Sequence, residues 1–77
     1  MNRDDLEKRL REKGIPQDAY VLSECFLNEV FCLSNKGDDW EVYYSERGIK
    51  TQLKKFDTES AACEYFYNQL LKIFEKN

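Results

Sequence analysis

Carboxylates and thiols are the side chains of this chain that could do chemistry. Histidine is absent from its 77 residues, which removes the commonest general base and the usual nitrogen ligand of metals. Two acidic pairs could exchange protons with a substrate, Asp38 with Asp39 and Glu41 with Glu46. Solvation of a turn explains Asp38 and Asp39 more simply. We therefore expect no enzyme activity.

The cysteines point to structural roles. Cys25, Cys32 and Cys63 are odd in number and show no CxxC spacing, and without histidine they do not make a zinc site. Secreted disulfide frameworks are usually even in number and denser. We expect reduced thiols in a cytoplasmic protein, with no metal, no disulfide and no cofactor. Cys63 is expected to be inert in the core, and Cys32 to be reactive if it is exposed.

Four residues in and beside one hairpin are the best candidates for binding a partner. Arg47 at the predicted tip could form bidentate hydrogen bonds with a carboxylate of the partner. Tyr43 and Arg47 are residue types that often anchor interfaces, and Glu41 and Lys50 would add a polar rim. We predict partner binding through these four residues. A turn that needs only polar residues and a glycine explains Arg47 equally well.

The candidate residues belong to a stretch from Trp40 to Gly48 that alternates with period two. Trp40, Val42 and Tyr44 share one face, as in a half-buried antiparallel strand. Turns on both sides make it the middle of a meander. The opposite, outward face then holds Val30, Cys32, Glu41, Tyr43, Ser45, Lys50, Gln52 and Lys54.

Both predicted hairpins give the same inward face for this strand. A turn centred on Lys36 and Gly37 pairs Leu33 with Trp40 and Phe31 with Val42. The second turn pairs Tyr44 with Ile49, Val42 with Thr51 and Trp40 with Leu53. The predicted core contains Trp40, Phe31, Leu33, Leu53, Phe66 and Leu70.

Helices flank the predicted sheet. Residues Asn2 to Lys13 form a short helix held by Leu6 and Leu10, or alternatively a charged docking helix, and Gly14 ends it. A longer helix from Glu59 to about Glu75 follows a cap at Asp57 or Thr58. Its apolar stripe covers the sheet and consists of Ala62, Cys63, Phe66, Leu70 and Ile73, with Tyr67 and Phe74 beside it.

The segment between the first helix and the meander is the least patterned. Residues Ala19 to Ser23 predict a short first strand, and Glu24 to Asn28 a loop. Phe26 and Leu27 in that loop either tuck under the sheet or stand exposed as an anchor. The whole reading is one α+β domain over residues 1–77: a short N-terminal helix, a four-stranded antiparallel meander and a C-terminal helix packed on one sheet face.

Charge and hydropathy exclude several function classes. The net charge is −3 and the isoelectric point is about 4.9, whereas nucleic-acid binders usually carry a basic surplus. No apolar run approaches the length of a membrane span, and Asn2 to Asp5 do not begin a signal peptide. We expect a protein partner, basic in character, and neither nucleic acid nor membrane.

Three segments together resemble a known group of proteins: Trp40 to Gly48, Lys55 to Glu59, and Ala62 to Phe66. They are similar to small proteins of Gram-positive bacteria that resemble immunity proteins of polymorphic toxin systems. The likeness covers about the last two thirds of the chain, and its motifs are structural rather than catalytic. It implies a cytoplasmic protein that binds and neutralises a cognate toxin, and it carries no functional residue to a position here.

Two other classes compete with toxin neutralisation. A small regulatory or scaffold module would form a homodimer through its sheet, and its mass would depend on concentration without any partner. An enzyme with unusual carboxylate chemistry would have a concave site lined by Glu or Asp with raised pKa values. Neutralisation predicts a toxin-like reading frame just upstream in the genome.

Overall fold

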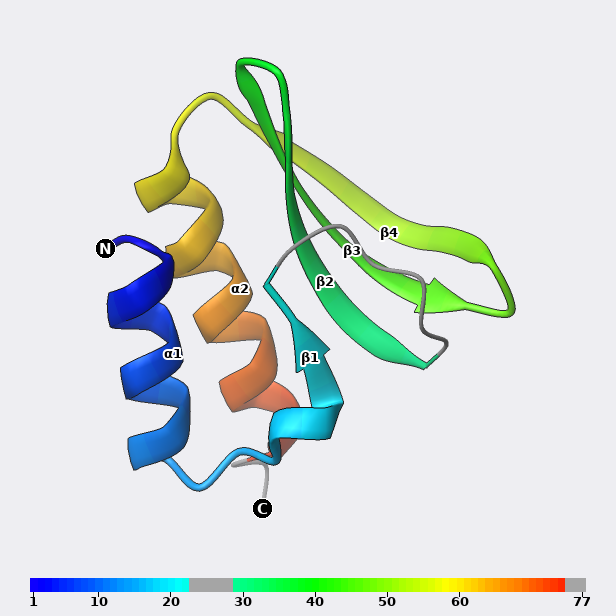
Figure 1. Cartoon of the computed structure of the whole chain (residues 1–77). Coiled ribbons are helices and arrows are strands. Elements are labelled where there is room, and N and C mark those ends of the chain that lie inside the picture. Colours follow the sequence, from blue (N-terminus) through cyan, green and yellow to red (C-terminus); the bar gives the residue numbers. More distant parts are fainter. Residues whose placement is uncertain (23–28, 75–77) are drawn as a thin grey trace.

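The computed structural model describes residues 1–22 and 29–74 (Figure 1). The predicted loop with Cys25, Phe26 and Leu27 lies outside the described residues. The elements follow in the order α1 (Arg3–Glu12), the 3-10 turn η1 (Gln17–Ala19), β1 (Tyr20–Val21), β2 (Val30–Lys36), β3 (Asp39–Glu46), β4 (Ile49–Phe56) and α2 (Glu59–Phe74). One sheet has the strand order β1-β2-β3-β4. The chain is therefore α+β, as predicted.

Helix α1 begins and ends where its capping residues predict. The side chain of Asn2 accepts a hydrogen bond of 2.8 Å from the backbone N–H of Asp5, which satisfies one free donor of the first turn. Gly14 follows the helix with a φ of +74°, a conformation that glycine adopts without strain. Leu6 and Leu10 are completely buried, and α1 packs against α2.

Helix α2 lies between α1 and the sheet. The Thr58 hydroxyl accepts a hydrogen bond of 3.1 Å from the N–H of Ala61, so Thr58 caps the helix. The helix contacts β2, β3 and β4, and its buried residue Phe66 packs against Tyr20 of β1 and Phe31 of β2. We call the sheet face that meets α2 the inner face and the opposite face the outer face.

The direction of β1 corrects the predicted antiparallel meander. β1 pairs with β2 in parallel, with Tyr20 opposite Phe31 and Val21 opposite Cys32. It begins one residue later than predicted, because Ala19 ends η1. Alternation has the same period in parallel and antiparallel strands, so the pattern carries no information on direction. The sheet is mixed.

The β2–β3 hairpin differs from the predicted register by two residues. Leu33 pairs with Val42 and Phe31 with Tyr44, because the loop contains only two residues and begins with a glycine of positive φ. A shift of two residues keeps every side chain on its face. The predicted inward face of β3 is therefore correct although the predicted partners are wrong.

A β-bulge in the β3–β4 ladder overturns the predicted burial of Leu53. The predicted partners of the second hairpin are wrong: Tyr44 pairs with Thr51 and not Ile49, Val42 with Lys54 and not Thr51, and Trp40 with Phe56 and not Leu53. Three residues of β3, from Val42 to Tyr44, thus face four of β4, from Thr51 to Lys54, so β4 carries one extra residue over this span. The residue before Leu53 has a φ of +56°. An extra residue reverses the faces of those that follow, and the Leu53 side chain is 42% exposed. Lys54, predicted on the outer face, is thus opposite an inner-face valine.

The core lies between the inner face and the helices. Leu33, Phe66 and Leu70 are completely buried, as predicted, whereas Phe31 and Trp40 are only partly buried at the edge of the same cluster. The buried members of this cluster are Leu6, Leu10, Ile15, Tyr20, Leu33, Val42, Ala62, Cys63, Phe66 and Leu70.

The outer face is more buried than the alternation predicts. Val30, Cys32 and Tyr43 form a second buried cluster, with Val21 of β1 packed against it. Glu41 and Ser45, which share this face, are also buried. Strand β1 adds apolar surface here through Val21, whereas the predicted outward face included no residue of the first strand.

Candidate functional site

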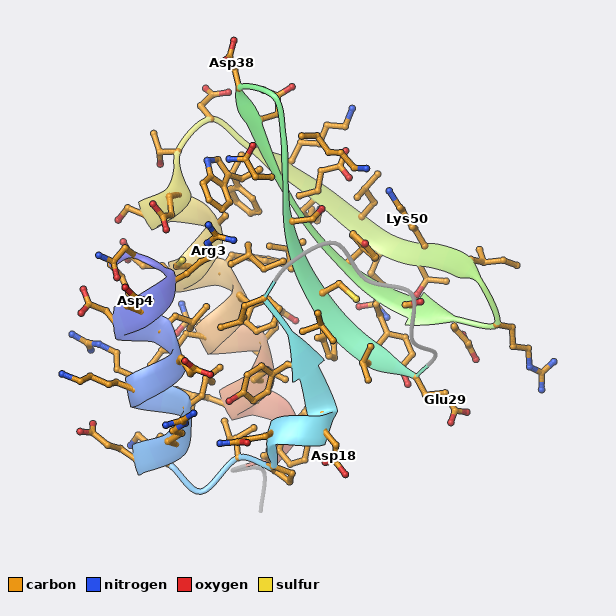
Figure 2. All side chains as sticks on the ribbon, viewed as in Figure 1. Arg3, Asp4, Asp18, Glu29, Asp38 and Lys50 are labelled. Atoms are coloured by element: carbon orange, nitrogen blue, oxygen red, sulfur yellow. The ribbon has the colours of Figure 1, made fainter. Side chains whose placement is uncertain are left out.

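Three of the four predicted partner-binding residues contact one another. The Lys50 Nζ atom lies 3.5 Å from Glu41 Oε1 and 4.8 Å from the centroid of the Tyr43 ring. Lys50 reaches this position from β4 (Figure 2). A half-exposed ion pair and a cation–π contact together stabilise the surface by only about 1–2 kcal/mol.

Burial limits what this cluster offers a partner. Tyr43 is 3% exposed and Glu41 is 9% exposed, so the Tyr43 ring is occupied within the protein. Arg47 is exposed at the tip of the β3–β4 hairpin with a φ of +51°, apart from the other three. Partner binding through Glu41, Tyr43, Arg47 and Lys50 stays a prediction.

The cysteines differ from their predicted chemistry in one respect. Cys63 is completely buried and free, and burial, followed by the negative charge of Glu59, raises the pKa of its thiol to about 11. Such a thiol is a poor nucleophile at neutral pH. Cys32 is buried and disulfide-bonded, which contradicts the predicted reduced state and leaves no reactive thiol at this position.

The acidic and sulfur-bearing side chains of residues 1–22 and 29–74 do not gather into a metal centre. In the part of the chain that the structure describes, no group of three or more such residues is placed to hold a metal ion. Neither described helix has the length and apolarity needed to cross a membrane. Two hollows lined by described residues are the candidate sites, and the segment formed by η1 and β1 contributes to both.

The first hollow, which we call the apolar hollow, opens at the C-terminal end of α2. Its volume is about 340 Å³, and its lining consists of Ala19, Glu29, Phe31, Tyr44, Gln52, Ile73 and Phe74. The rings of Phe31 and Tyr44 lie 5.0 Å apart, and the Phe31 ring meets Phe66 edge-on at 6.4 Å. Aromatic rings that pack in this way form a preorganised apolar surface.

Exposed apolar side chains stand at this hollow. Ile73 is 49% exposed and Phe74 is 44% exposed, although Ile73 was predicted to belong to the stripe that covers the sheet and Phe74 to lie beside that stripe. They occupy the last turn of α2. The sequence signal was present, since an apolar stripe that continues to the end of a helix can extend past the surface it covers.

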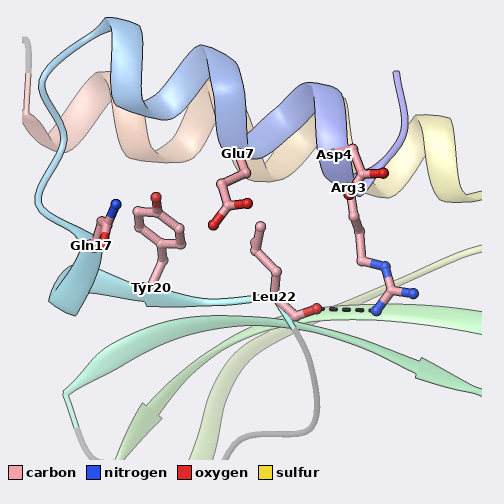
Figure 3. Close-up of a pocket in the computed structure, with 6 residues that line it drawn as sticks. All are labelled: Arg3, Asp4, Glu7, Gln17, Tyr20 and Leu22. Carbon is pink, nitrogen blue, oxygen red and sulfur yellow. Dashed lines mark hydrogen bonds between the residues drawn. The ribbon is translucent and has the colours of Figure 1, made fainter.

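The second hollow, which we call the polar hollow, lies between α1 and β1 (Figure 3). Its volume is about 370 Å³, and Arg3, Asp4, Glu7, Gln17, Tyr20 and Leu22 line it. Arg3 Nη1 donates a hydrogen bond of 3.2 Å to the Leu22 carbonyl, which joins the start of α1 to the chain just beyond β1. The sequence does not predict this hollow. Its residues come from α1, η1 and β1 and the residue after β1, and hydrophobic periodicity does not predict how separate elements pack against one another.

Tyr20 is the unusual residue of the polar hollow. Its side chain belongs to the core, where its ring meets Phe66 edge-on at 6.3 Å. Its hydroxyl is buried and has no hydrogen-bond partner among the described residues. Burial raises the pKa of the Tyr20 phenol, and the negative charge of Glu7 raises it further.

No family model, curated protein or solved structure matches this chain. The resemblance to immunity proteins therefore stays an expectation from the sequence.

Proposed function

We propose that this chain is a non-catalytic binding protein that contacts a partner protein through the apolar hollow. Following the sequence resemblance, we propose that the partner is a toxin and that binding neutralises it. The observation that carries the proposal is the exposure of Ile73 and Phe74 beside a preorganised aromatic surface.

Exposed apolar residues that gather around a concavity are typical of protein interfaces. Interface energy concentrates in a few apolar or aromatic anchors that fill such concavities. A partner that inserts an apolar side chain into this hollow would bury exposed apolar surface of Ile73 and Phe74. Leu53 is exposed to a similar extent, at 42%, but does not line the hollow, and so it provides a matched control.

Charge specifies the partner further. Glu29 is the one charged residue in the described lining of the apolar hollow, and Asp18 precedes the lining residue Ala19 (Figure 2). The chain also carries a net charge of −3. We propose that the partner presents a basic residue beside its apolar anchor, because opposite charges at a rim speed encounter and select the partner.

The cytoplasmic location is part of this proposal, and the disulfide at Cys32 weighs against it. Disulfides persist mainly in oxidising compartments. Fractionation of cells that make the protein, combined with thiol labelling of Cys32, decides the location independently of the binding experiment.

The test is coexpression with the product of the gene just upstream. Cells that make that product alone should stop growing, and this chain should restore growth. Ile73→Gln should weaken binding of the two purified proteins by at least about fivefold, the loss of roughly 1 kcal/mol that marks an anchor. Leu53→Gln should leave the affinity unchanged.

Three results would overturn the proposal. The first is an absence of binding, and the second is equal affinity of the Ile73→Gln and Leu53→Gln proteins. The third is a mass that rises with concentration in the absence of any partner and falls back to the monomer in Ile73→Gln. That result would assign the apolar hollow to a second copy of the chain.

A further inference from the structure

The Tyr20 hydroxyl poses a physical problem that the folded chain does not solve alone. Tyr20 is 7% exposed, and its hydroxyl has no partner among the described residues. The ring cannot turn outward without losing its edge-on contact with Phe66 at 6.3 Å. Buried hydroxyl groups without partners are costly and rare in native proteins. Such a group that faces a hollow indicates a missing hydrogen-bonding partner.

The hydroxyl is flanked by other polar groups. Figure 3 shows it directed toward α1, between the Gln17 amide on one side and the Glu7 carboxylate on the other. The phenol oxygen of β1 and the carboxylate of α1 are both acceptors on this hollow. The Gln17 amide of η1, drawn with its nitrogen toward Tyr20, can present either its NH2 donor or its carbonyl acceptor. Asp4 lies one helical turn before Glu7 on the same hollow, and Leu22 supplies an apolar wall.

The positive charges near the hollow are already engaged. The Arg3 guanidinium donates to the Leu22 carbonyl, lies 3.9 Å from Glu59 and stacks over Trp40 at 5.4 Å. Arg11 pairs with Glu7 at 3.4 Å, but both side chains are about half exposed. Exposed pairs of this kind are weak, so a ligand can displace Arg11. Asp4 forms no ion pair in the described part of the chain.

We propose that the polar hollow binds an alkylammonium group. An ammonium has three N–H donors and no acceptor, which matches the acceptors of Glu7 and Tyr20. The Gln17 carbonyl becomes a third acceptor when its amide rotates by half a turn. Its alkyl chain would lie against Leu22. The surface side chain of Glu7 turns away from Arg11 to admit it. This site goes beyond the proposed partner surface and does not depend on it.

An alkylammonium group has two sources, a small free amine or the lysine side chain of a peptide. Both present the same head group on an aliphatic stem, and only the atoms beyond the stem differ. The experiment therefore compares n-butylammonium with a blocked Gly-Lys-Gly peptide. Tighter binding of the peptide assigns the site to a lysine of a partner, and equal binding assigns it to a free amine.

The test is a titration followed by the amide NMR signals of Gln17 and Tyr20. n-Butylammonium chloride should shift both signals to saturation. Tetramethylammonium, which has the charge but no N–H donor, should not. Glu7→Gln should weaken binding about tenfold, the effect of removing one charge-assisted hydrogen bond, and Tyr20→Phe should weaken it severalfold.

A matched control comes from the other orphan hydroxyl. Ser34 Oγ is also buried and unpartnered among the described residues, but it does not line the polar hollow, so Ser34→Ala should leave amine binding unchanged. Three outcomes would overturn the proposal: a linear response without saturation, an equal response to tetramethylammonium, or undiminished binding in Glu7→Gln. Glu7 is half exposed on α1, so Glu7→Gln tests the site without changing the core around Tyr20.

Discussion

The two hollows are nearly equal in volume and opposite in chemistry. Consecutive residues separate them, since Ala19 lines the apolar hollow and Tyr20 the polar one. Both also rest on the same aromatic ring, because Phe31 and Tyr20 each meet Phe66 edge-on at 6.4 and 6.3 Å. The two hollows therefore adjoin the same core ring and differ in the side chains that line them.

The two hollows also contain different kinds of energetically unfavourable group. The apolar hollow has apolar side chains exposed to water, and the polar hollow has a buried hydroxyl without a hydrogen-bond partner among the described residues. Each costs free energy in the isolated chain, and a ligand of the right chemistry removes each cost. Substitutions should then act on the two hollows independently unless they reach Phe66.

The largest expected effect comes from the shared ring itself. Phe66→Ala should destabilise the protein by about 3–5 kcal/mol, because it removes a completely buried ring and leaves a cavity. Both hollows should lose binding together. Urea unfolding measures the change. Trp40→Ala should lower the free energy of unfolding by less, since Trp40 is only partly buried. A larger decrease for Trp40→Ala than for Phe66→Ala would show that Trp40, and not Phe66, is the central residue of the core.

The dependence of stability on alkaline pH should show whether the core around Cys63 excludes water. The folded Cys63 thiol has a pKa of about 11 against an ordinary value of 9.0. Because the folded pKa is raised, the stabilisation is complete below pH 9 and is lost as the pH rises through 11. The loss should reach about 2–3 kcal/mol. Urea unfolding of Cys63→Ala should lack this component, and identical pH profiles would show that the thiol is hydrated.

The unpartnered Tyr20 hydroxyl should destabilise the free protein. Tyr20→Phe should stabilise the free protein by about 1 kcal/mol, because it removes a buried group without a partner. Ser34→Ala should have a similar effect on stability. Thermal unfolding of both variants measures this. Destabilisation by Tyr20→Phe alone would mean that the hydroxyl already has a good partner in the free protein.

The smallest effects should come from the exposed residues at and away from the apolar hollow. Ile73→Gln and Leu53→Gln should each change stability by no more than about 0.5 kcal/mol, since both side chains are nearly half exposed. Chemical denaturation of the two variants checks this. If Ile73→Gln alone were strongly destabilised, Ile73 would be a core residue and the apolar hollow would lose its exposed anchor.

Local sequence patterns predicted the helices and strands but not how they pair and pack against one another. The start of α1 after Asn2, a cap of α2 at Asp57 or Thr58, the α+β class and the inward face of β3 followed from residue types and alternation. The bulge that exposes Leu53 did not, because one residue in αL conformation reverses a face without changing composition. The parallel direction of β1 also left no trace in a two-residue strand.

The candidate sites were harder to predict for the same reason. The predicted cluster of Glu41, Tyr43 and Lys50 does form contacts, because the three residues lie on neighbouring strands of one hairpin. The polar hollow combines α1, η1 and β1, which are joined only by the fold. Tyr20 itself resembles any strand tyrosine in sequence, and its orphan hydroxyl is visible only in three dimensions.

The central claim, that a partner binds at the apolar hollow, is tested most directly with isoleucine methyl groups. The chain has three isoleucines: Ile15 is buried, Ile49 is 63% exposed beside the tip of the β3–β4 hairpin, and Ile73 is 49% exposed at the hollow. Methyl NMR spectra with and without the product of the upstream gene should show a large shift for Ile73 and little change for Ile15 and Ile49. A shift of Ile49 with Ile73 unchanged would contradict the account and place the partner on the hairpin around Arg47.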